Sequence, residues 1–162
     1  MAMPTDINYL GNGSPQGSII RGQSRPVIQG NGATRTLLQR ESGALVLFDR
    51  AAGIVYTLPA PIEGTYFDFA VTVSVTSNAA KVITDAAATF IVGAVNMVTI
   101  ATVAGAGFSA NGTTIRALSA NGSTTGGLVG ETYRVTAMSA TQWVISGVTV
   151  GSGTILTPFA TS

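Results

Sequence analysis

Strict alternation of apolar and polar side chains over residues 65–76 constrains the fold of this chain more than any other feature. Five apolar residues occupy one face of the segment, and mainly polar residues occupy the other. The apolar residues are Phe67, Phe69, Val71, Val73 and Val75. A period of two residues is typical of a half-buried β-strand. The same alternation recurs in Thr132–Ala137 and around Trp143, which we expect in the core.

Short β-branched runs separated by turn residues fill the rest of the chain after residue 43, and no segment has the pattern of an amphipathic helix. About ten short strands with short connections predict an all-β fold, an antiparallel jelly-roll or sandwich-like domain. Asn111-Gly112 and Asn121-Gly122 are the best hairpin turns, because type I′ turns need a positive φ that Asn-Gly accepts.

The first 36 residues differ from the remainder, because glycine, proline and asparagine interrupt every apolar run. We therefore expect residues 1–36 to be an extended N-terminal arm and residues 37–162 to be the β-domain. The arm is also basic, with one acidic residue. Its expected partner-binding residues are three arginines and two apolar pairs: Arg21, Arg25, Arg35, Ile19, Ile20, Val27 and Ile28.

Two interpretations of the arm are open. In one, it is a solvated flexible tail. In the other, it becomes ordered on a partner: the apolar pairs add a strand to a neighbour's sheet edge, and the guanidinium groups bind carboxylates.

The composition argues against catalysis. The 162 residues include no histidine and no cysteine, only seven carboxylates and eight basic residues, and these form no recognisable catalytic motif. We therefore expect a non-enzymatic protein with no catalytic residues, cofactor or metal.

A net charge of +1 with 9% charged residues argues against nucleic acid as a partner. With 46% hydrophobic residues, the chain is expected to associate with copies of itself.

No membrane partner is expected either. The uncharged stretch Ala86–Phe108 is long enough to cross a bilayer, but threonines and glycines interrupt it and no aromatic belt flanks it, so buried strands explain it better. Residues 1–9 contain neither a basic nor an apolar signal region. We therefore expect synthesis in the cytoplasm without use of the general export route.

Residues 47–60, with the sequence LFDRAAGIVYTLPA, and residues 64–69, with GTYFDF, resemble a pattern in structural proteins of tailed bacteriophages, especially head decoration or cement proteins. The resemblance extends over residues 43–76. In this pattern Gly53 serves a turn, Pro59 ends a strand, and Gly64 precedes the next chain reversal. The matched positions are turn and core residues, so no functional residue is carried over.

The resemblance implies a virion protein that forms homotrimers on the outer capsid surface, with an N-terminal arm reaching onto the major capsid protein. Such a protein stabilises the head by bridging neighbouring capsid subunits. The same module occurs in phage tail spikes and fibres, so a receptor- or glycan-binding tail module is the alternative. A secreted polysaccharide hydrolase is a third possibility, but this chain lacks the paired carboxylates that such an enzyme uses.

Overall fold

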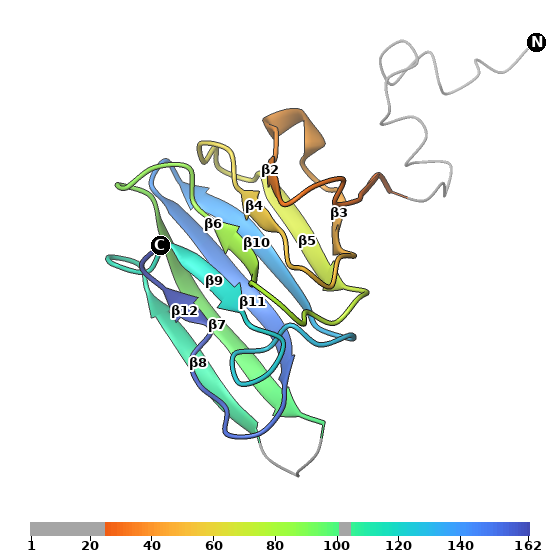
Figure 1. Ribbon diagram of the computed structural model, residues 1–162. Helices are drawn as coiled ribbons and strands as arrows, with labels where there is room; N and C mark the ends of the chain where they lie inside the picture. Colours follow the sequence, from red (N-terminus) through yellow and green to blue (C-terminus); the bar gives the residue numbers. More distant parts are fainter. Residues whose placement is uncertain (1–24, 101–104) are drawn as a thin grey trace, which may run out of the picture.

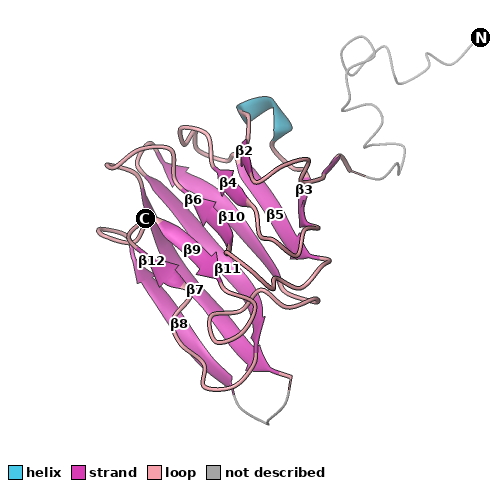
Figure 2. Cartoon of the chain, viewed as in Figure 1, coloured by secondary structure: helices cyan, strands magenta, loops and turns pink. Residues whose placement is uncertain are grey.

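The computed structural model describes residues 25–100 and 105–162. Within them, two β-sheets pack face to face, with one short 3-10 turn, η1 (Gln39–Glu41). Figure 1 shows the short strands of the smaller sheet lying over the long strands of the larger one, and Figure 2 shows the near absence of helix. The predicted all-β, sandwich-like domain is confirmed.

The larger sheet has seven described strands in the order β1-β3-β5-β10-β11-β7-β8. Their bounds are β1 (Val27–Ile28), β3 (Leu45–Phe48), β5 (Tyr66–Val71), β10 (Thr132–Ser139), β11 (Gln142–Gly151), β7 (Phe90–Thr99) and β8 (Gly105–Asn111). The smaller sheet has the order β12-β9-β6-β4-β2. Its strands are β12 (Phe159–Ala160), β9 (Ala117–Ala120), β6 (Ala80–Ile83), β4 (Val55–Thr57) and β2 (Thr34–Thr36).

The expected antiparallel pairing is wrong for much of the fold. From β1 to β6 the chain alternates between the two sheets, so each strand pairs with the strand two places earlier and runs in the same direction. The pairs β1–β3, β3–β5, β2–β4 and β4–β6 are all parallel. The pair β7–β11 is also parallel, whereas β10–β11 and β7–β8 are antiparallel hairpins. The sheets are therefore mixed, and jelly-roll connectivity is not supported.

The core lies between the sheets and follows the predicted alternation. Phe67 and Phe69 are 0% and 1% exposed, and Trp143 is fully buried with its ring centroid 6.3 Å from that of Phe67. The alternation ends earlier than expected, since β5 stops at Val71. The next two backbone N–H groups both donate to the carbonyl of Phe48, because the chain leaves the ladder here to cross to the other sheet.

The expected arm boundary at residue 36 is wrong for the described residues. Val27 and Ile28 pair with Leu45 and Val46, and β2 pairs with β4, so residues 25–36 belong to the β-domain. Gly30 permits this, because a Cβ there would lie 2.1 Å from the side chain of Ile54. Gly30 therefore allows close packing with the domain, in addition to interrupting an apolar run.

The two Asn-Gly turns are not hairpin turns between paired strands. Asn111 ends β8, after which the chain crosses to the smaller sheet, and its Oδ1 accepts hydrogen bonds from the backbone N–H groups of Thr113 and Thr114 at 3.0 and 2.9 Å. Asn121 accepts equivalent bonds from Ser123 and Thr125 after β9. The asparagine side chains fix the turns by Asx-type bonding.

Candidate interaction site on the outer face of the larger sheet

The outer face of the larger sheet carries a continuous row of residues, one from each strand. The pairing register places them side by side in the order Val27, Leu45, Asp68, Arg134, Ser146, Ala94 and Ser109. Because side chains alternate between the faces of a strand, all of them point away from the core. Only two members of this row are charged, and they are neighbours.

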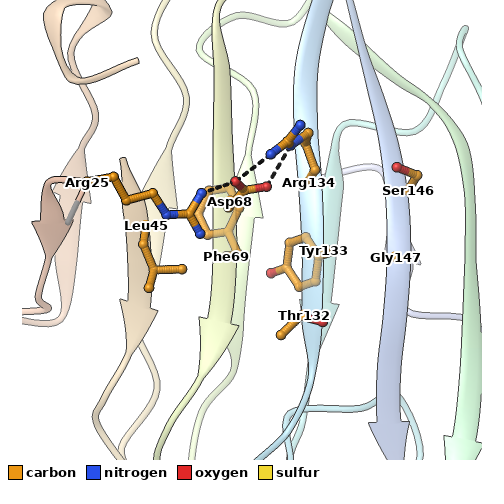
Figure 3. Close-up of a pocket in the computed structure, with 9 residues that line it drawn as sticks. All are labelled: Arg25, Leu45, Asp68, Phe69, Thr132, Tyr133, Arg134, Ser146 and Gly147. Atoms are coloured by element: carbon orange, nitrogen blue, oxygen red, sulfur yellow. Dashed lines mark hydrogen bonds and ion pairs between the residues drawn. The ribbon is translucent and has the colours of Figure 1, made fainter. Parts of the chain in front are cut away.

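Asp68 and Arg134 form the centre of the site. Arg134 donates from Nε to Oδ1 of Asp68 at 2.7 Å and from Nη2 to Oδ2 at 2.8 Å. Arg25 donates from Nη1 to the same Oδ2, so two arginines share one carboxylate (Figure 3). The guanidinium of Arg134 also lies 4.7 Å from the centre of the Tyr66 ring, within the range of a cation–π contact.

The hydrogen bond from Arg134 lowers the pKa of Asp68, and Arg25 adds to this, while partial burial opposes it. The same pair raises the pKa of Arg134. With two guanidinium groups on one carboxylate, the cluster keeps a net charge of +1. The guanidinium-bearing side chains of Arg25 and Arg134 remain 41% and 53% exposed, so they can also meet an acidic group of a partner.

A shallow, open depression of about 410 Å³ lies beside this cluster. The adjoining strands β3, β5, β10 and β11 line it, and Ser146 and Gly147 lie on the side opposite Arg25 (Figure 3). Ligand pockets usually enclose most of a small molecule. An open depression with Arg25 and Arg134 in its lining is better suited to an acidic side chain from another protein.

The structure separates the arginines that we predicted to act together. Arg25 lies on the outer face of the larger sheet, whereas Arg35, in β2, binds Glu41 Oε1 at 2.7 Å. Both arginines therefore bind carboxylates of their own chain. Val27 is 51% exposed and Ile28 is 6% exposed, so Ile28 contributes to the core. Arg21, Ile19 and Ile20 lie outside the described residues.

Sequence reasoning gave no role to a buried carboxyl group, Glu131, which is 1% exposed. Its Oε2 accepts hydrogen bonds from the backbone N–H groups of Gly127 at 2.7 Å and Val150 at 3.2 Å. Burial raises the pKa of Glu131 to about 7, although both bonds oppose the shift. These two hydrogen bonds connect the turn before β10 to the end of β11. No motif in the sequence indicates that Glu131 has this role.

No group of three or more potential metal-ligating side chains occurs in residues 25–100 and 105–162. In the same residues, no helix has the length and apolar character needed to span a bilayer. In comparisons with known proteins, no family model, no curated protein and no solved structure matches this chain. The strand pairing alone defines the class of protein, which is a two-layer β-sandwich with mixed sheets.

Proposed function

We propose that this chain is a non-enzymatic structural protein of a bacteriophage virion. It binds the outer capsid surface and stabilises the head by bridging neighbouring subunits of the major capsid protein. The observation that carries the proposal is the outer face of the larger sheet, which is broad, open and charged only at the Arg25–Asp68–Arg134 cluster among the described residues of its strands. Such a face suits protein contact better than binding of a small substrate.

Exposed apolar side chains on this face support the same role. Val98 in β7 and Val148 in β11 are 44% and 39% exposed, and they lie on neighbouring strands, since Val148 pairs with Asn96. Val27 adds another exposed apolar side chain at the β1 edge. Burying apolar area against a partner contributes about 25 cal/mol per Å², while the two exposed arginines supply orientation.

A tail module that binds a receptor glycan is the competing proposal. Sugar-binding sites commonly use an exposed aromatic ring as a platform. Among the described residues, none of the exposed large apolar side chains is aromatic, and the Tyr66 ring lies beneath Arg134. The described surface therefore favours a head protein, working as a trimer as the resemblance implies.

The test uses heads of the phage that encodes this chain, prepared with its gene deleted. Purified full-length protein is titrated onto these heads, and occupancy is measured by sedimentation and by cryo-electron microscopy. We expect saturable binding that makes the heads more resistant to heat. Binding to isolated tails but not to heads would support the tail alternative, and binding to neither would refute the virion proposal.

Two variants locate the attachment. Arg134→Ala removes an exposed guanidinium from the cluster and should weaken head binding about tenfold, or 1.4 kcal/mol. Arg40→Ala, which removes an exposed arginine from η1, is the matched control and should bind normally.

Deleting residues 1–24 tests the arm, including Ile19, Ile20 and Arg21. Full binding by that deletion would leave the flexible-tail interpretation standing.

A further inference from the structure

Four described strands form the edges of the two sheets, and one of them differs from the others. Strands β1 and β12 have two residues each and β2 has three, whereas β8 has seven. Strand β8 contains no charged residue and no proline, and its pairing with β7 runs without a bulge. Proteins normally protect an edge by shortness, charge, proline or a bulge, because an open edge pairs with other strands. Strand β8 has none of these protections.

The backbone of β8 is oriented for such pairing. The N–H of Gly112 donates to the carbonyl of Ile91 at 3.0 Å, which fixes the phase of the antiparallel ladder. By alternation, the N–H and C=O groups of Ser109 and Gly107 then point away from β7. Both residues are exposed, and no hydrogen bond to these backbone groups is found within residues 25–100 and 105–162.

The chemistry of this edge favours a second copy of the same strand as its partner. In a two-fold contact both copies present the same strand, so a strand with charges of one sign would repel its copy. No residue from Ala86 to Ile115 is charged, and this range includes both β7 and β8. The glycines, alanines and serine of β8 are small and allow two backbones to approach closely. This range also contains no carboxylate side chain. The arginines of a neighbouring copy's N-terminal segment would therefore find no ion-pair partner on β8.

We propose that β8 pairs antiparallel with β8 of a second copy across a two-fold axis, joining two larger sheets into one continuous sheet. The inference goes beyond the proposed function, because a two-fold contact is separate from the three-fold contacts of the trimer proposed above. It predicts an assembly with an even number of chains: a dimer, or a pair of trimers if the chain also forms trimers elsewhere on its surface.

The first test compares two lysine substitutions by light scattering on a size-exclusion column at about 10 µM protein. Gly107→Lys places a charge on β8, and a Cβ there fits, since its nearest neighbour is Asn96 Oδ1 at 3.4 Å. Thr34→Lys adds the same charge to the exposed edge strand β2 and is the matched control. We expect Gly107→Lys to halve the mass of the assembly and Thr34→Lys to leave it unchanged.

A second measurement uses the unmodified protein and so does not depend on the folding of a variant. Amide hydrogen exchange should be at least tenfold slower at Ser109 in the assembly than in protein diluted until it dissociates. A monomeric protein, a trimer, or an assembly in which Ser109 shows no concentration-dependent protection would overturn the β8 contact. Head binding is measured separately, so the virion proposal can stand or fall independently of this result.

Discussion

Asp68 and Arg134 lie directly opposite each other on β5 and β10, joined by two hydrogen bonds of 2.7 and 2.8 Å. Arg25, which precedes β1, binds the same carboxylate, so one acidic side chain links three separate parts of the larger sheet. The carboxylate thus has a structural role within the chain. It also fixes the direction of the two arginines that we propose for partner binding.

The first prediction concerns Asp68→Asn, which leaves Arg25 and Arg134 close together without a carboxylate. We expect a loss of about 1 kcal/mol in the free energy of unfolding at pH 7, because exposed ion pairs are individually weak and this one is bidentate. Urea unfolding measures it. Asp85→Asn, at an exposed acid after β6, is the control and should cost less.

The same variant should have a characteristic pH dependence. Arg134 lowers the pKa of Asp68 in the folded protein, so its stabilisation is present above the unfolded pKa, near 4, and is lost as pH falls through the lower folded pKa. The difference between Asp68→Asn and the unmodified protein should therefore shrink below about pH 4. A constant difference down to pH 2 would contradict the assigned ion pairs.

The second prediction concerns Glu131, whose folded pKa is raised to about 7 by burial. The folded state then holds a proton that the unfolded state releases near pH 4, so stability should fall as pH rises from about 4 to 7 and level off above that. The total loss is about 3 to 4 kcal/mol. Glu131→Gln should remove this dependence, and thermal unfolding from pH 4 to 8 measures it. Equal pH profiles for both proteins would show that Glu131 is ionised in the fold.

Local alternation of side chains was enough to predict which residues form the core. Phe67, Phe69 and Trp143 are buried as expected, because a strand with one apolar face must cover that face. Strand direction could not be predicted in the same way. The parallel pairs from β1 to β6 arise from repeated crossings between sheets, and neither apolar periodicity nor turn residues encode which sheet the next strand joins.

The candidate site was only partly predictable for a related reason. Sequence reasoning selected Arg25 because it lies in a basic, charge-poor segment, yet the partners Asp68 and Arg134 are 43 and 109 positions further along the chain. Only the pairing register brings them together. Glu131 was equally hidden, because its burial depends on contacts with Gly127 and Val150 rather than on a local pattern.

The third prediction tests the core. Phe67→Ala and Phe69→Ala should each lower the free energy of unfolding by about 3 to 5 kcal/mol, since both rings are fully enclosed and their removal leaves cavities. Thr72→Ser, at an exposed position just after β5, should cost under about 0.5 kcal/mol. Chemical denaturation of all three variants provides the comparison, and similar costs at the three positions would mean that the assigned faces of β5 are wrong.

The last prediction locates the N-terminal boundary of the fold by comparing chains that start at Arg25 and at Leu37. The second deletion removes β1 and β2, with their pairing to β3 and β4 and the buried side chain of Ile28. It also removes the hydrogen bonds that Gly30 donates to Asp49.

We therefore expect the chain starting at Leu37 to unfold at a temperature at least about 5 °C lower than the chain starting at Arg25, because the loss of a buried isoleucine alone costs about 2 kcal/mol or more. Differential scanning calorimetry measures both. As a control, Val27→Thr in the full chain alters an exposed side chain of β1 and should change the melting temperature little. Equal melting temperatures for the two deletions would restore the boundary at residue 36. A lower value for the chain starting at Leu37 shows that residues 25–36 are part of the sandwich and confines any separate arm to residues 1–24.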